Sequence, residues 1–260
     1  MTAGIDDLIP LLEEHLPRLR AQGSSEVLMA SDGDCTLWHE DIGEALFRHA
    51  LEAGVLKPAA RAALAAEAWV WGVDGSGDDP NEIARRLFVA HVEGRYPSRP
   101  AYAMMAWAFA GFRPAELAAL CEEVLDAFDL AGKQRASLVP VLRWAEAQAV
   151  PFWLVSASPL AVVEAAARRL GLDVSRVLAM TPELAGDVLA PRLARTATYA
   201  EGKLHRLREV SAGPLLAGFG DSDYDGALLE AAAVAVAVAP KAELRARMAR
   251  REGPVVIVEA

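Results

Sequence analysis

The sequence predicts an α/β fold in which a parallel sheet carries helices on both faces and a helical segment is inserted after the first strand. Two patterns predict it. Short apolar runs alternate with helical stretches, which is typical of a parallel sheet covered on both faces. The runs 27–30, 151–155 and 214–219 each end in acidic or hydroxyl side chains, and polar groups of such sheets collect at the carboxyl ends of the strands, where ligands bind.

The elements are expected in the following order. Residues 5–19 place apolar side chains at helical spacing, which predicts an amphipathic helix before the first strand at 27–30. From about 41 to 132 one helical stretch follows another, with turns at 72–80 and 94–100. Further helices are predicted at 138–148, 160–170, 203–210 and 225–233, in alternation with the strands at 151–155 and 214–219.

The helical segment divides the chain into two predicted domains. Residues 1–40 and 136–260 form the sheet domain, and residues 41–135 form an all-helical cap. Aromatic residues are concentrated in the cap segment, as expected of a helical unit that fills its own core with large side chains.

The composition favours a globular enzyme. Of the 260 residues 53% are hydrophobic, so the chain can bury a sizeable core and is not disordered. Acidic side chains outnumber basic ones by 36 to 26, and the resulting charge of −10 argues against nucleic acid as a partner. The longest apolar run, 231–240, is shorter than the roughly 18 residues of a membrane span, which argues against a membrane partner.

The N-terminal residues and the cysteines indicate the compartment. The first 25 residues carry acidic side chains rather than a basic and an apolar stretch, so no secretory signal is expected. Two cysteines, Cys35 and Cys121, make a disulfide scaffold implausible and suit a reducing environment. We therefore expect a cytoplasmic protein, and the sequence pattern carries no signal for an oligomeric state.

Charged side chains at the predicted strand ends form a candidate catalytic site. Asp32 and Asp34 are two residues apart, so both carboxylates lie on one face of an extended segment. The carboxyl ends of the other strands meet at the same edge of the sheet. We expect four further polar residues there: Ser156, Lys203, Asp221 and Asp225.

Taken in order, these residues resemble the four sequence motifs of the haloacid dehalogenase superfamily. The motifs are DGDCT at 32–36, Ser156, Lys203 and GDSDYD at 220–225, and the resemblance extends over residues 27–255. Each motif is weak by itself, whereas their order, with strands before three of them, is specific. The resemblance implies a Rossmann-like core with an inserted helical cap.

The resemblance further implies a phosphatase that uses two carboxylates in turn. Asp32 is the implied nucleophile, and its attack on a phosphoryl group forms an aspartyl-phosphate that splits hydrolysis into two displacements. Asp34 protonates the leaving alcohol and then deprotonates the water that opens the intermediate. True dehalogenases of the superfamily lack an acid at the second position, so Asp34 favours a hydrolase of small phosphomonoesters.

A Mg²⁺ site is implied by the same resemblance. Crowded carboxylates repel each other and a dianionic substrate, so a hard divalent cation is required. Mg²⁺ is expected on the carboxylates of Asp32 and Asp221 and on the main-chain carbonyl of Asp34. Asp225 is expected to support these ligands from behind.

The remaining motif residues are expected to serve the phosphoryl group and the turn. Lys203 and Ser156 would hold phosphoryl oxygens and stabilise the charge of the transition state. The hydroxyl of Thr36 is expected to fix the turn after Asp34. Cys35 is expected to take no catalytic role.

Two alternatives to hydrolysis stay open. The aspartyl-phosphate could pass to an acceptor hydroxyl rather than to water, which would make the protein a phosphotransferase. A catalytically idle member could bind a phosphorylated ligand, but idle members commonly lose one of the motif residues, and here all of them are present.

Residues near and within the cap segment indicate the branch and the leaving group. The place of the cap resembles the phosphoserine-phosphatase branch, and Trp38, Asp41, Glu44 and Trp107 resemble residues of bacterial phosphorylcholine phosphatases. An acid could pair with an ammonium group and a tryptophan could offer its ring face, which favours an amino-alcohol phosphate such as phosphoserine or phosphocholine. Alternatively, the two acids form a solvated helix face and the rings only pack in the cap core.

Overall fold

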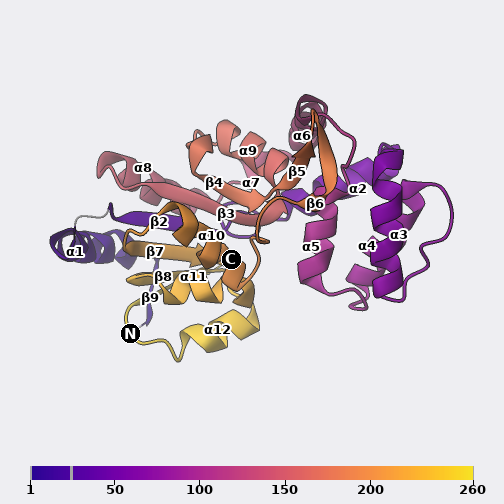
Figure 1. The fold of residues 1–260 in the computed structure, drawn as a ribbon. Coiled ribbons are helices and arrows are strands. Elements are labelled where there is room, and N and C mark those ends of the chain that lie inside the picture. The colour runs from indigo at the N-terminus through magenta and orange to yellow at the C-terminus, as the bar shows by residue number, and fades with distance from the viewer. Residues whose placement is uncertain (1, 24–25, 260) are drawn as a thin grey trace.

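Figure 1 shows the fold in a computed structural model that describes residues 2–23 and 26–259. Within these residues, seven strands form one sheet in the order β1-β9-β8-β7-β2-β3-β4, and every strand pair in it is parallel. The predicted parallel sheet is therefore confirmed. Its strands are β1 (Thr2–Ala3), β2 (Leu28–Ser31), β3 (Phe152–Pro159), β4 (Val177–Met180), β7 (Leu215–Gly220), β8 (Val234–Val238) and β9 (Val255–Val258).

Strand β2 brings the polar strand ends together. Ala30 of β2 lies opposite Trp153 of β3 on one side and opposite Gly218 of β7 on the other. Because the three strands run in the same direction, their carboxyl ends are neighbours, as the sequence predicted. The strand predicted to be first is, however, second in the chain, because the two residues of β1 already pair with β9.

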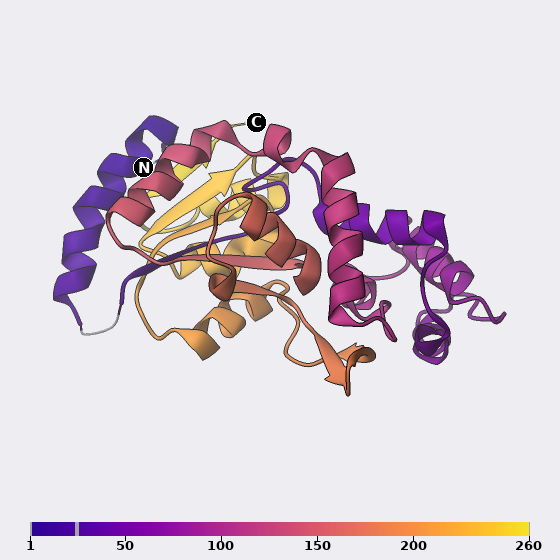
Figure 2. The same ribbon diagram turned by 90° about the horizontal axis from the view of Figure 1, so that it is seen from above.

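Helices cover both faces of the sheet, and Figure 2 shows α1 and α8 together on one side of it. Met29 of β2 packs into a core cluster with residues of α1, α8 and α9, whereas Leu28 and Ala30 pack into a second cluster with α10, α11 and α12. This alternation follows from the two-residue period of a strand. The covering helices are α1 (Leu8–Ala21), α8 (Val139–Ala147), α9 (Leu160–Arg169), α10 (Glu201–Val210), α11 (Gly226–Glu230) and α12 (Ala242–Met248).

Helix α11 is shorter than the helix predicted at 225–233. A 3-10 turn at Asp223–Asp225 occupies its expected start, and β8 begins at Val234. Four more 3-10 turns are described, at Ile5–Asp7, Pro58–Ala60, Ala136–Leu138 and Val174–Arg176. None of the helices within the described residues is long and apolar enough to cross a membrane.

The chain between β2 and β3 is helical and extends to one side of the sheet (Figure 1). Its first helix begins at the cap residue Asp41, whose carboxylate accepts a hydrogen bond from the Glu44 amide at 2.8 Å, and it ends at Gly54 with φ of 64°. The helices are α2 (Ile42–Ala53), α3 (Arg61–Val70), α4 (Pro80–Val92), α5 (Ser98–Trp107), α6 (Pro114–Phe128) and the single turn α7 (Leu130–Lys133).

The helical insertion and the sheet share a hydrophobic core. Leu8 of α1, Met29 of β2 and Phe47 of α2 belong to the same cluster of buried side chains. Helix α6 also packs against α9, which covers the sheet. The insertion is thus held in place by apolar contacts as well as by the two chain connections.

An antiparallel hairpin, β5 (Pro182–Ala185) and β6 (Val188–Leu193), was not predicted from the sequence. Leu189 exchanges hydrogen bonds with the loop between α5 and α6: the Gly111 amide donates to its carbonyl and its own amide donates to the Phe112 carbonyl, both at 2.8 Å. Prolines at 182 and 191 weaken the strand pattern in this segment. The hairpin therefore depends on a partner far away in the chain.

We predict that Phe47→Ala lowers the free energy of unfolding by about 3–5 kcal/mol, because it leaves a cavity in the shared core. The Phe47 side chain is fully buried and packs on Phe88 with ring centroids 5.7 Å apart. Trp69→Ala is the matched control, because the Trp69 side chain is 83% exposed. This substitution should change the free energy of unfolding by less than about 0.5 kcal/mol. Urea unfolding measures both, and equal losses would contradict the shared core.

Candidate active site

Side chains from four segments meet at the carboxyl ends of β2, β3 and β7. Asp32 follows β2, Asp221 follows β7, Ser158 lies near the end of β3, and Lys203 lies in the first turn of α10. All four are buried, and together with Asp34 they line a cavity of about 70 Å³. The structure thus brings the predicted acids and the lysine to one place.

Lys203 supplies the positive charge in this cluster. Its ammonium lies 2.8 Å from Asp32 Oδ1 and 2.5 Å from Asp225 Oδ1, and its side chain is only 3% exposed. Burial alone would lower the pKa of Lys203, but Asp225 and Asp32 raise it above the usual value, so the lysine stays charged. This buried ammonium, which lines the cavity, is well placed to meet an anionic group that enters it.

Three carboxylates form a candidate metal centre. Asp32, Asp221 and Asp225 are buried, and each offers an oxygen atom within 4.8 Å of those of the other two. Burial, and then the charge of Asp225, raise the pKa of Asp32 well above its usual value, although Lys203 opposes the shift. A nucleophilic carboxylate must be ionised, so the cluster fits an added divalent cation, and its oxygen donors suit Mg²⁺.

Asp225 organises the turn that carries Asp221. Its Oδ2 accepts hydrogen bonds from the amides of Asp221 at 3.2 Å and Ser222 at 3.1 Å, while its Oδ1 pairs with Lys203. A Cβ at Gly220 would lie 2.2 Å from the Asp225 Cβ, so this position needs glycine. Asp225 therefore holds Lys203 with one carboxylate oxygen and the backbone of the turn with the other.

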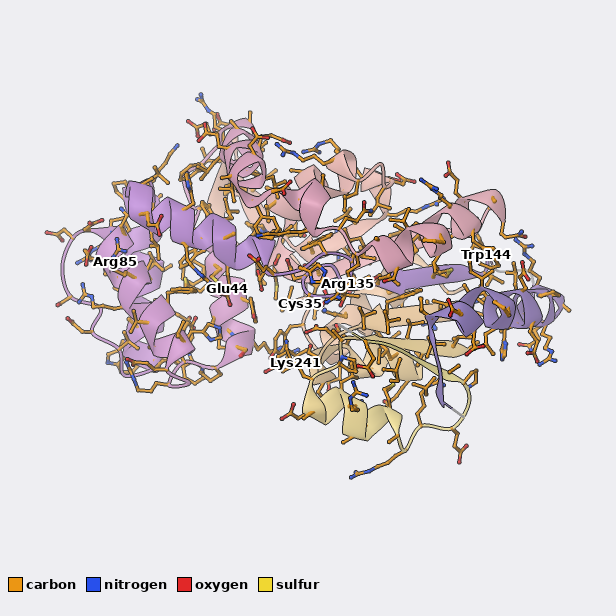
Figure 3. The ribbon with its side chains drawn as sticks, turned by 180° about the vertical axis from the view of Figure 1, so that it is seen from behind. Cys35, Glu44, Arg85, Arg135, Trp144 and Lys241 are labelled. Atoms are coloured by element: carbon orange, nitrogen blue, oxygen red, sulfur yellow. The ribbon has the colours of Figure 1, made fainter. Side chains whose placement is uncertain are left out.

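The entrance of the cavity carries a second lysine that the sequence analysis did not single out. Lys241 Nζ lies 2.8 Å from Asp221 Oδ2, and 60% of the Lys241 side chain is exposed. Figure 3 shows Lys241 and Cys35 where the helical insertion meets the sheet. Burial, with Asp221 and Asp34 nearby, raises the pKa of the Cys35 thiol to about 12, so Cys35 is not a thiolate nucleophile at neutral pH.

The Asp34 carboxylate accepts hydrogen bonds from four donors. Trp38 Nε1 at 3.0 Å and the Ile42 amide at 2.7 Å donate to Oδ1, and the hydroxyls of Ser158 at 2.7 Å and Ser156 at 3.3 Å donate to Oδ2. Burial raises the pKa of Asp34, and the hydrogen bonds from Ile42, Ser158 and Trp38 oppose that shift. The acid next to the expected nucleophile is thus firmly held.

Two motif hydroxyls, those of Ser156 and Thr36, do not line the cavity. Ser156 is fully buried and does not line the cavity, where Ala157 and Ser158 take its place. Its action on a phosphoryl oxygen stays a prediction. The hydroxyl of Thr36 is buried without a hydrogen-bond partner among the described residues, and the turn is closed instead by the Thr36 amide, which donates to the Gly33 carbonyl at 3.1 Å.

Of the four residues expected to contact the leaving group, only Asp41 lines the cavity. The Trp38 ring is fully buried and its N–H is taken by Asp34, and Trp107 packs in the hydrophobic core. The Glu44 carboxylate pairs with Arg48 on the helix surface. For Glu44, helix geometry explains this outcome, because α2 begins after Asp41 and turns Glu44 away from the cavity.

Asp41 is a buried acid at the cavity without a cationic partner among the described residues. Burial and the nearby Asp34 raise the pKa of Asp41 well above its usual value, and among the described residues no cationic side chain lies within salt-bridge distance of it. Its hydrogen bond from the Glu44 amide fixes the carboxylate at the start of α2.

Three tyrosines that the sequence analysis did not single out also line the cavity. Tyr102 comes from α5, Tyr199 from the loop before α10 and Tyr224 from the turn after β7, and all three line the cavity. Ring centroids are 6.0 Å apart for Tyr102 and Tyr199 and 4.5 Å apart for Tyr199 and Tyr224. No local pattern could have joined them, since the three segments are far apart in the chain.

The chain is similar to a known protein family in sequence and to several solved structures in fold. Residues 29–230 match the family model of haloacid dehalogenase-like hydrolases, whereas no curated protein sequence matches the chain significantly. Similar solved structures include a protein of unknown function from Bordetella pertussis Tohama I, with a TM-score of 0.69 and 24% identity over 90% of this chain and 99% of that one.

Two phosphoserine phosphatase structures are also similar. A phospho-aspartyl intermediate analogue of phosphoserine phosphatase has a TM-score of 0.53 and 14% identity, over 91% of this chain and 95% of that one. A probable phosphoserine phosphatase from Vibrio cholerae has a TM-score of 0.55 and 15% identity, over 90% of this chain and 66% of that one. At these identities the likeness shows the fold.

The family model covers most of the chain, from β2 to the end of α11. The matched residues include Asp32, Ser156, Lys203 and Asp221, one from each motif that the sequence analysis singled out. The chain therefore belongs to the haloacid dehalogenase-like hydrolases.

Proposed function

We propose that the protein hydrolyses a small phosphomonoester through an aspartyl-phosphate on Asp32. One observation carries the proposal: the Asp32 carboxylate lines the cavity 2.8 Å from the buried ammonium of Lys203, with a second acid, Asp34, on the same wall. The fold shared with phosphoserine phosphatases supports it.

The residues of the cavity divide the reaction between them. A carboxylate oxygen of Asp32 bonds to phosphorus as the bond from phosphorus to the leaving oxygen breaks. Asp34 gives its proton to the leaving oxygen and, in the second step, takes a proton from the water that attacks the phosphorus. Lys203 neutralises the phosphoryl oxygens in both steps, and Ser156, which lies behind the cavity wall, is proposed to assist it.

Mg²⁺ is the cofactor that we propose for the carboxylate cluster. The carboxylates of Asp32 and Asp221 and the main-chain carbonyl of Asp34 would hold it, and Asp225 would support them through the turn that it orders. Bound there, Mg²⁺ supplies the positive charge that keeps Asp32 ionised and reduces the repulsion between Asp32 and an anionic substrate.

The chemistry of the wall favours a leaving group with a positive charge. Asp41 has no cationic partner among the described residues, and tyrosine rings face the same cavity. A carboxylate beside aromatic rings suits an ammonium or a quaternary ammonium group. The proposed substrates are therefore amino-alcohol phosphates such as phosphoserine or phosphocholine.

We predict that Asp32→Asn lowers turnover at least about a thousandfold, because an amide cannot form the aspartyl-phosphate. The assay is phosphate release from phosphoserine, phosphocholine, phosphoethanolamine and 4-nitrophenyl phosphate, with Mg²⁺ present, and thermal unfolding checks the fold. Asp187→Asn, which changes an exposed acid paired with Arg113, is the matched control and should keep full activity. Residual activity of Asp32→Asn above a thousandth would reject Asp32 as the nucleophile.

Removal of Asp221 should weaken metal binding. We expect Asp221→Asn to raise the Kd for Mg²⁺ at least about tenfold in isothermal titration calorimetry, since it loses a charged ligand. The control is Asp223→Asn two residues along, whose carboxylate lies 3.1 Å from Arg247 and outside the cluster. Equal affinities for the two variants would place the metal elsewhere.

Asp41→Asn tests the charge of the leaving group. Asparagine caps a helix as well as aspartate, so α2 should stay intact. We expect kcat/KM for phosphocholine and phosphoethanolamine to fall about five- to a hundredfold, the value of an ion pair of roughly 1–3 kcal/mol, with little change for 4-nitrophenyl phosphate. Glu44 lies outside the cavity, so Glu44→Gln is the control and should leave kcat/KM unchanged for charged and neutral substrates alike. Equal losses of kcat/KM on charged and neutral substrates in Asp41→Asn would indicate a structural role for Asp41.

A further inference from the structure

The donors around Asp34 differ in kind between its two oxygens. Oδ1 accepts from the Trp38 indole at 3.0 Å and from the Ile42 amide at 2.7 Å, and both of these groups can only donate. Oδ2 contacts the hydroxyls of Ser158 at 2.7 Å and Ser156 at 3.3 Å, and a hydroxyl can either donate or accept. A proton on Asp34 can therefore reside only on Oδ2, because the serine hydroxyls can turn their own hydrogen atoms away from that oxygen whereas the two N–H groups on Oδ1 cannot.

Two glycines leave room for the side chains that donate hydrogen bonds to Asp34. A Cβ at Gly33 would lie 2.5 Å from the Trp38 ring, and a Cβ at Gly43 would lie 2.3 Å from the Ser158 hydroxyl. Both glycines thus leave the space that a donor to Asp34 occupies. Trp38 is fully buried, so its ring has no freedom to swing away from the carboxylate.

The four donors come from different parts of the fold. Trp38 lies in the loop after β2, Ile42 opens the first helix of the insertion, and Ser156 and Ser158 belong to β3 in the sheet. The Asp34 carboxylate is therefore held between the insertion and the sheet at the same time. Neither part alone could fix its orientation.

We propose that Trp38 and Ser158 are positioning residues that present Oδ2 of Asp34 as the proton-carrying oxygen of the general acid. The inference rests on the proposed function. In the first step the Oδ2–H bond breaks and its proton goes to the leaving oxygen, which keeps the electron pair of the broken bond to phosphorus, while Asp32 bonds to phosphorus. The Asp34 carboxylate left behind accepts all four hydrogen bonds, which stabilise the negative charge that it gains.

The test compares substrates that differ in their need for a proton. An alkyl leaving group such as that of phosphoethanolamine requires protonation, whereas 4-nitrophenolate leaves without it. The ratio kcat/KM covers the steps up to formation of the aspartyl-phosphate, so it reports proton donation to the leaving group without the later hydrolysis. We measure kcat/KM for both substrates with Mg²⁺ in the wild type, in Trp38→Phe and in Ser158→Ala.

The expected result is a selective loss. Each variant removes one hydrogen bond to a charged group, so kcat/KM for phosphoethanolamine should fall about tenfold, whereas that for 4-nitrophenyl phosphate should change less than about twofold. Trp144→Phe is the matched control, because Trp144 on α8 is also buried and its indole N–H has no hydrogen-bond partner within the described part of the chain. Figure 3 shows Trp144 far from Cys35 and Lys241.

Other results would overturn the inference. Equal losses on both substrates, or no loss on either, in the variants that keep the wild-type thermal unfolding would show that Trp38 and Ser158 do not orient the acid. Ser158→Ala removes only one oxygen atom, so it gives an answer even if Trp38→Phe does not fold. A wild-type protein inactive on both substrates would reject the proposed function, and the positioning role with it, whereas an active wild type isolates the role of Trp38 and Ser158.

Discussion

The site depends on one buried ion cluster, in which the ammonium of Lys203 lies between Asp32 and Asp225. Removing a charged group from water costs several kcal/mol in a folded protein unless a partner of opposite charge is in place. Lys203 is that partner for two carboxylates at once, and Asp221 finds a second one in Lys241. The cluster keeps an excess of negative charge, which suits a divalent cation. The proposed chemistry depends on that cation.

The backbone is shaped around these charges. Gly220 leaves room for Asp225, whose carboxylate orders the turn after β7 through the amides of Asp221 and Ser222. Gly33 and Gly43 leave room for the side chains that donate to Asp34. At all three glycines a methyl group would press on a group that orients an acid of the site. The precision of the site therefore comes from close packing as much as from hydrogen bonds.

The helical insertion completes the site rather than merely covering it. Ile42 at the start of α2 donates to Asp34, while Asp41 and Tyr102 line the cavity from the side of the insertion. The sheet supplies the residues proposed for attack on phosphorus, and the insertion supplies Asp41 and Tyr102, two of the residues proposed to meet the leaving group. This division explains how one core could serve different substrates when the residues of the insertion change.

The sequence by itself determined the parallel sheet, the helical character of the insertion and the residues of the acid and lysine cluster. Those features are local: strands and helices follow from the spacing of apolar residues, and a carboxylate that follows a buried strand must emerge at the sheet edge. Only the tertiary structure decided that Trp38 is a donor to Asp34 rather than a wall of the cavity, that Ser158 rather than Ser156 lines it, and that three tyrosines and the hairpin β5–β6 come together as they do. The physical reason is that these outcomes depend on contacts between segments far apart in the chain, where neither hydrophobic period nor residue spacing carries information about which side chains will meet.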